Sequence, residues 1–185
     1  MIQAQKIIQG NIIGTRNNIT VAIQKSNDGF NRVLRKFYDV SGQEPKWIAT
    51  KKTRSLAFDA YVGEKKTPVF YHEKITTLAP DNNDIARENI VDRYYSAKTK
   101  QKLVERLFNW QVPKSSLSEK TLEKEENFAG WHNNAVCNSK VDLKCYGISQ
   151  VSDSQGHKFY NNNNLISESE YNKILRTKSS KLQSY

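Results

Sequence analysis

The stretch TPVFYHEKITTL, residues Thr67–Leu78, consists mainly of Thr, Val, Ile and aromatic residues. Such side chains are enriched in β-strands because they pack well on a pleated surface. Three further segments of this kind precede it, namely Asn18–Gln24, Arg32–Val40 and Lys46–Thr50. The segment Thr53–Val62 fits either a short helix or a strand. We therefore predict that the first eighty residues are rich in β-structure, with Asn17-Asn18 as a turn between strands.

The middle of the chain shows apolar residues at helical spacing instead. Asp81 is a suitable N-cap for a first helix, and Ser96 for a second that ends before Pro113. The two expected apolar stripes are Ile85, Ile90, Val91, Tyr94 and Tyr95, and then Leu103, Val104, Leu107 and Phe108. Ser116 and Glu119 form a capping box ahead of a third expected helix, Leu117 to about Phe128. This pattern predicts a helical middle.

The last fifty residues return to strand composition and then end in a helix. Lys140–Ile148 predicts a strand, and SDSQG at 152–156 predicts a turn into a strand at His157–Tyr160. Ser167 and Glu170 form a capping box for a terminal helix that we expect to fray beyond Thr177.

No repeat or clear linker interrupts the chain, so we predict one α+β domain over residues 1–185. Its expected parts are a β-rich N-terminal half, a helical middle, and a β-hairpin plus short helix at the C-terminus. The alternative is a boundary near residue 80, between a basic β-rich part (1–80) and a helical and β/α part (81–185).

Composition excludes several classes of protein. Apolar residues make up 37% of the chain and there are 19 aromatic residues, which argues against a disordered tail, a collagen-like repeat or a disulfide-framed mini-protein. No segment approaches the roughly 18 consecutive apolar residues of a membrane span, and residues 1–10 do not resemble a signal peptide. Cys137 and Cys145 are the only cysteines. We therefore expect a cytoplasmic protein in a reducing compartment, with no membrane partner.

The formal net charge of +10 is unevenly distributed. Residues 1–80 carry a net charge of +7, residues 81–135 a net charge of zero, and residues 136–185 a net charge of +3. A basic β-rich segment of this kind favours a polyanionic partner, most often DNA or RNA. The alternative is that the charge only keeps the protein soluble.

Seven cations lie within residues 32–54, interleaved with aromatic side chains. Cations suit phosphate, and an aromatic ring can stack on an exposed base. The candidate nucleic-acid-binding residues are Arg32, Arg35, Lys36, Trp47, Lys51, Lys52 and Arg54. Alternatively, the aromatic residues belong to the core and the cations line a solvated strand.

A second candidate site is Asp142-Leu143-Lys144. On a strand this spacing would place a carboxylate and an ammonium group on one side of a sheet, which suits phosphodiester hydrolysis with a divalent metal. The triplet resembles the D/E-x-K half-motif of the PD-(D/E)xK nuclease superfamily, over about the last fifty residues. That resemblance implies a Mg²⁺-dependent endonuclease in which Asp142 and Lys144 are catalytic. Glu126 would be the upstream carboxylate, holding the metal together with Asp142, although no Pro-Asp pair precedes the motif.

Other constellations are weaker. His132 with Asn164 and Asn172 would be needed for an HNH-type site, and a zinc set would need both cysteines with His132 and His157. His72 has no obvious partner in the sequence. No Walker-type loop, dinucleotide fingerprint or G-x-S-x-G motif occurs.

Three functions remain open at this level. The chain is a nucleic-acid-binding protein, a small Mg²⁺-dependent endonuclease, or a basic subunit of a larger nucleoprotein assembly. Among protein partners, a homodimer or a larger assembly stays open.

Overall fold

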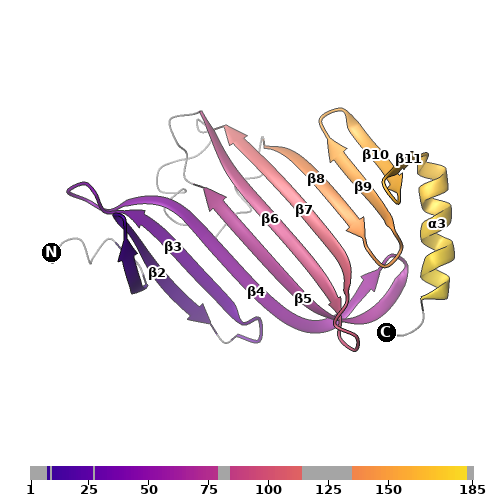
Figure 1. Cartoon of the computed structure of the whole chain (residues 1–185), viewed down its shortest axis with the longest axis horizontal. Helices are drawn as coiled ribbons and strands as arrows, with labels where there is room; N and C mark the ends of the chain where they lie inside the picture. Colours follow the sequence, from indigo (N-terminus) through magenta and orange to yellow (C-terminus); the bar gives the residue numbers. More distant parts are fainter. Residues whose placement is uncertain (1–7, 9, 27, 79–83, 114–134, 183–185) are drawn as a thin grey trace. The chain divides into compact units, whose positions relative to one another are not determined.

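The computed structural model describes residues 8, 10–26, 28–78, 84–113 and 135–182. Strands account for 68% of them, and a single helix accounts for 10%. The strands form a sheet in which each strand pairs with its neighbours in sequence order, from β1 to β11 (Figure 1). The N-terminal strands are β1 (Asn11–Arg16), β2 (Ile19–Ser26), β3 (Arg32–Asp39), β4 (Lys46–Val62) and β5 (Lys65–Leu78). They are followed by β6 (Ile85–Ser96), β7 (Lys102–Pro113), β8 (Val136–Leu143), β9 (Ile148–Asp153), β10 (Gly156–Asn161) and β11 (Asn164–Ile166). The helix is α3 (Glu168–Lys181).

The chain divides into two compact units, and the divisions fall within strands β4 to β8. Unit 1 comprises residues 1–54, 74–89 and 110–136, and unit 2 comprises residues 55–73, 90–109 and 137–185. Each unit is described by itself below.

Unit 1 is built on the antiparallel strands β1, β2 and β3 and the first part of β4. Asn17 and Asn18 connect β1 to β2 with φ angles of 49° and 62°, the left-handed conformation that a tight hairpin turn needs. The turn predicted at these two residues is therefore confirmed. One core cluster packs Ile8, Ala22 and Tyr38 together, and Trp47 lies against it.

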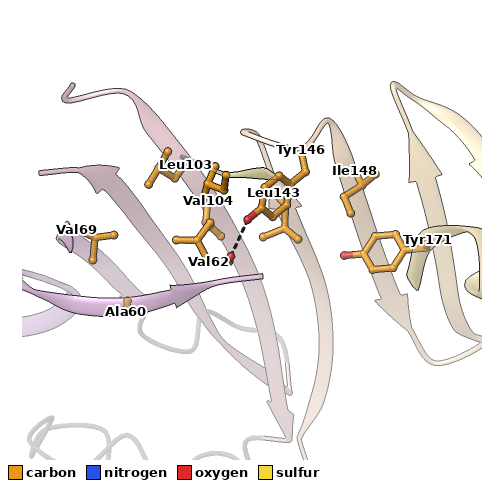
Figure 2. Packing of buried hydrophobic residues seen from close by; sticks show 10 residues of the cluster. Ala60, Val62, Val69, Leu103, Val104, Leu143, Tyr146, Ile148 and Tyr171 are labelled. Atoms are coloured by element: carbon orange, nitrogen blue, oxygen red, sulfur yellow. Dashed lines mark hydrogen bonds between the residues drawn. The ribbon is translucent and has the colours of Figure 1, made fainter. Parts of the chain in front are cut away.

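Unit 2 contains the larger apolar core, to which strands β4, β5, β7, β8 and β9 and helix α3 contribute buried residues (Figure 2). Its buried members include Val62, Val69, Leu143 and Ile148. The Tyr146 hydroxyl lies within this core and donates a hydrogen bond of 2.8 Å to the carbonyl oxygen of Val62. This bond satisfies a buried polar group at the point where the turn after β8 meets the end of β4.

Helix α3 begins where the capping box predicted it. The Ser167 side chain accepts a hydrogen bond of 3.2 Å from the Glu170 N–H. The expected fraying beyond Thr177 is wrong, because the helix continues to Lys181. Ser179 and Leu182 are only 3% and 5% exposed, so tertiary packing holds the last turn in place.

The α+β class with a helical middle is wrong. The segments expected as the first two helices are strands β6 and β7. In β6 the buried positions Ala86, Glu88, Asp92 and Ser96 recur at even spacing, and three of the four are polar. A search for alternating apolar residues therefore does not detect the two-residue period of β6. The third expected helix, Leu117 to about Phe128, lies outside the described residues.

Two other predictions are resolved by the strands. Thr53–Val62, which fitted a helix or a strand, belongs entirely to β4. Lys140–Ile148 is not one strand, because β8 ends at Leu143, β9 begins at Ile148, and a turn with Gly147 at φ 69° separates them. Within the described part of the chain, no helix has the length and apolarity needed to cross a membrane.

Candidate nucleic-acid interface

The pairing of β2, β3 and β4 determines which side chains share a face of unit 1. Arg35 on β3 lies opposite both Ile23 on β2 and Lys51 on β4. Directly opposed residues in an antiparallel pair point to the same side. We name the side that carries Arg35 and Lys51 the basic face. The opposite side carries the buried residues Ala22, Lys36 and Thr50, and we name it the buried face.

A third cation, Lys74 on β5, joins Arg35 and Lys51. Lys74 alternates along β5 with the buried residues Glu73 and Ile75. Desolvation lowers the pKa of Lys51 below its ordinary value, and the charges of Lys74 and Arg35 lower it further. Three adjacent strands thus present three like charges close enough to act on one another. Among the described residues, no ion pair connects any of the three to a carboxylate.

Exposed cations surround this row. Arg16 and Lys25 pair with Ile19 and Val33 at positions of the same face, and Lys46 pairs with Asp39. Arg87 follows Ala86, whose packing against Trp47 places Ala86 on the buried face and Arg87 on the basic face. Among the described strand residues of unit 1, the cations of the basic face are Arg16, Lys25, Arg35, Lys46, Lys51, Lys74 and Arg87.

Asp39 is the one carboxylate among the described strand residues of that face. Its Oδ1 accepts a hydrogen bond of 2.9 Å from the Ser41 N–H. This bond lowers the pKa of Asp39, and Lys46 lowers it further. Asp39 lies at the end of β3, four residues from Arg35, so it leaves the charge of the central row in place.

The nucleic-acid-binding residues predicted from the sequence do not all lie on one face, because strand alternation divides them between the basic face and the buried face. Arg35 and Lys51 lie on the basic face, whereas Arg32, Lys36 and Lys52 pair at positions of the buried face. Arg54 follows Lys52 at the same parity, and the side chains of Lys36, Lys52 and Arg54 all take part in interactions. Lys36 is only 6% exposed. Arg32 is exposed and forms an ion pair with Asp28.

Trp47 is partly buried and packs against two apolar clusters of unit 1. Its side chain packs against Ala22 and Tyr38 as well as against Ala86 and Val112. The indole Nε1 donates a hydrogen bond of 2.9 Å to Thr50 Oγ1. This position fits the alternative that we stated from the sequence, in which the aromatic residues pack in the core and do not stack on bases.

Lys74 and Arg87 were missed by sequence reasoning, since both lie outside the cation-rich segment 32–54. The sequence nevertheless contained a signal for Lys74. Within Thr67–Leu78 the residues Val69, Tyr71 and Ile75 share one parity, which places Lys74 on the opposite side of the strand.

The other candidate site, in unit 2, has a different geometry from the one expected. Asp142 lies near the end of β8 opposite Ser149, and Lys144 lies in the turn that follows. Lys144 Nζ is 2.8 Å from Asp142 Oδ2, and the Asp142 side chain is 18% exposed. This hydrogen bond and the charge of Asp142 raise the pKa of Lys144. The two groups therefore neutralise each other.

Glu126, the expected second metal ligand, lies outside the described residues. Within the described ranges no group of three or more His, Cys, Asp or Glu side chains could hold a metal ion. A Mg²⁺ ligand set is thus not assembled around Asp142 in that part of the chain.

The histidine and cysteine candidates are likewise dispersed. His157 Nδ1 lies 2.7 Å from Ser152 Oγ on the exposed surface of β9 and β10, and His132 lies outside the described residues. Both cysteines are free. Burial raises the pKa of Cys145 to about 11, so it is a protonated thiol at neutral pH.

The chain was compared with protein-family models, curated proteins and solved structures, and none of them matches it.

Proposed function

We propose that this protein binds nucleic acid through the basic face of unit 1, mainly by contacts to phosphate groups. The observation that carries the proposal is the row Arg35, Lys51 and Lys74 on three neighbouring strands. Like charges next to one another on a sheet destabilise it. A polyanion that bound across the row would relieve this repulsion, because its phosphates would neutralise the three charges.

The spacing of the row fits a phosphate backbone. Neighbouring strands lie about 4.8 Å apart, so three strands carry their charges across about 10 Å. Long Lys and Arg side chains can adjust this spacing to successive phosphates. Contacts of this type bind DNA or RNA with little dependence on base sequence. We also propose a cytoplasmic location, which the two free cysteines support.

The salt dependence of binding tests this proposal. Three phosphate contacts predict a slope of about −2.7 in a plot of log affinity against log salt for duplex DNA, and about −2.1 for a single strand. Between 50 and 200 mM salt, affinity would then fall by about 40-fold or about 18-fold. Fluorescence anisotropy with a labelled random duplex and a labelled single strand measures both. Equal affinity at the two salt concentrations would refute the proposal.

Lys51 and Lys52 form a matched pair for locating the interface, since they are adjacent in sequence and lie on opposite faces. We expect Lys51→Ala to remove one phosphate contact and so to change the duplex slope from about −2.7 to about −1.8. Affinity would then fall only about 12-fold between 50 and 200 mM salt. Lys52→Ala should leave the slope unchanged. Circular dichroism confirms that both variants are folded. The opposite ranking would place the nucleic acid on the buried face and contradict the assignment.

A further inference from the structure

Strand β1 forms one end of the strand order, and β2 is its only neighbour among the described strands. All six of its residues are exposed, and Ile12 and Ile13 are 47% and 59% exposed. An end strand presents a row of N–H and C=O groups to which another strand can add. Natural edge strands usually carry charges, proline or β-bulges that discourage such pairing, and β1 has one register shift, between Ile12 and Gly14. Arg16, the last residue of β1, is its only charged side chain.

β1 is held in strand conformation by β2, so it does not have to order itself when a partner arrives. Thr15 Oγ1 lies 2.8 Å from Thr20 Oγ1 across the two strands. The register shifts between Ile12 and Gly14, so that Ile13 has no partner residue in β2. A pre-formed edge lowers the entropic cost of adding another strand.

The other end of the strand order restricts what that added strand can be. It is β11, which has only three residues, Asn164–Ile166. Pairing of β1 with β11 of another copy would be head-to-tail and would propagate into a filament. Pairing of β1 with β1 of another copy engages six residues from each chain. It also closes under a two-fold axis, as most homo-oligomers do.

We propose that β1 pairs antiparallel with β1 of a second copy of this chain, forming a homodimer with a continuous sheet across the contact. A register that sets Asn11 opposite Arg16 of the second copy also sets Ile12 opposite Thr15 of that copy. Asn11 and Arg16 both occupy basic-face positions, and Ile12 and Thr15 both occupy buried-face positions. Each pair thus joins side chains that point to the same side, as antiparallel pairing requires.

The centre of this register falls between Ile13 and Gly14. A side chain at Gly14 would meet no other atom within 4 Å, so the space beside it is open. Ile13 of the second copy can pack there, which would remove apolar surface from water in both chains.

The two-fold axis would run perpendicular to the sheet, so both basic faces would lie on the same side of the dimer. A nucleic acid could then contact both copies, and the proposed binding surface would double. The dimer itself does not depend on nucleic-acid binding and is tested without it.

Sedimentation equilibrium of the full chain, without nucleic acid, tests the pairing. We use protein from 1 to 200 µM at about 300 mM salt, where repulsion between the two basic chains is screened. The average mass should rise from 21.3 kDa toward twice that value and stop there. A constant mass of 21.3 kDa overturns the proposal, and a mass that continues to rise contradicts closed β1 pairing.

A double variant, Ile12→Lys with Ile13→Lys, should remain monomeric over this range. Leu107→Lys is the matched control, because Leu107 is also an exposed apolar residue, 39% accessible, but lies on the interior strand β7. The control should dimerise like the wild type. A dimer that persists in the double variant would place the contact elsewhere.

Hydrogen exchange of the unmodified chain provides a test that no substitution can disturb. Amides of residues 11–16 should become more protected as protein concentration rises, whereas those of residues 164–166 should not change. Protection that is confined to residues 164–166 would assign the contact to β11 and overturn the β1 pairing.

Discussion

Replacing Gly63 by alanine tests the packing of helix α3 against the rest of unit 2. Gly63 lies in the turn between β4 and β5 with φ at 62°, a conformation that costs alanine about 1 kcal/mol. The added Cβ would lie 2.5 Å from Ser179 Oγ, 2.8 Å from Tyr146 Cε2 and 3.0 Å from Leu175 Cδ1. Relieving such overpacking costs about 1–3 kcal/mol. We therefore expect Gly63→Ala to lower the free energy of unfolding by about 2–4 kcal/mol.

Thermal unfolding measures this loss. For a chain of this size, 1 kcal/mol corresponds to a change in Tm of about 2–4 °C, so Tm should fall by about 4–16 °C. The clash includes Ser179, whose Oγ accepts a hydrogen bond of 3.1 Å from the Glu64 N–H. Hydrogen exchange should therefore accelerate in α3 before it accelerates elsewhere.

Substitutions at two other glycines separate the backbone cost from the cost of overpacking. Gly29 has φ at 80° and Gly14 does not have a positive φ, and a Cβ at either position would meet no atom within 4 Å. Gly29→Ala should show the backbone cost alone, and Gly14→Ala should change Tm little. If Gly63→Ala left Tm within about 2 °C of the wild type, the close packing of α3 against this turn would be refuted.

Three further predictions concern single groups. Tyr146→Phe removes the donor to the buried Val62 carbonyl and should cost about 1–3 kcal/mol in urea unfolding; no loss would mean that water satisfies this carbonyl. Because the folded state lowers the pKa of Lys51, the unfolded state binds more protons just below pH 10.5, and stability should rise with pH in that window. Lys51→Met should weaken this rise, and an identical pH dependence in both proteins would contradict it. Since Lys144 is bonded to Asp142, plasmid DNA should stay intact with Mg²⁺; cleavage that Asp142→Ala abolishes would restore the endonuclease hypothesis.

Local sequence signals predicted the structure well where the local residues determine the conformation. Thr67–Leu78 lies within β5, because its β-branched and aromatic residues suit a strand and its period of two is visible. The Asn17-Asn18 turn and the Ser167 cap were also predictable, since each depends on side chains within three residues.

Strand β6 could not be predicted in this way, because three of its four buried residues are polar. Asp92 is buried, and its carboxylate accepts hydrogen bonds from the Tyr71 hydroxyl at 2.9 Å and from Arg106 Nη2 at 3.0 Å. Arg106 also lies 5.7 Å from the centre of the Tyr94 ring. The partners are 14 to 21 residues from Asp92 in the sequence, so no short window shows that a carboxylate there can be buried.

The sequence predicted that the candidate site is basic, but it did not predict which cations belong to it. Alternation alone places Arg35 and Lys36 on opposite sides of a strand, but it does not say which side is buried. That choice follows from the packing of Tyr38, Trp47 and Ala22, which come from three different strands. The sequence therefore indicated a basic segment and could not distinguish the half-buried Arg35 and Lys51 of the basic face from the buried Lys36.

Cations on neighbouring strands are paired with a carboxylate in unit 2, but not in the central row of the described part of unit 1. This contrast supports the proposal that unit 1 binds a polyanion. In unit 2, Glu105 lies 2.8 Å from both Arg93 Nε and Lys102 Nζ, and these contacts lower the pKa of Glu105. Cations on neighbouring strands there share a carboxylate. In the described part of unit 1, no carboxylate forms an ion pair with the central row of Arg35, Lys51 and Lys74. Desolvation lowers the pKa of Lys51, and the charges of Lys74 and Arg35 lower it further. A glutamate at one position of the row would remove that repulsion, as Glu105 does in unit 2. A basic face that retains unbalanced charge at a cost in stability is expected where a binding partner supplies the missing anions.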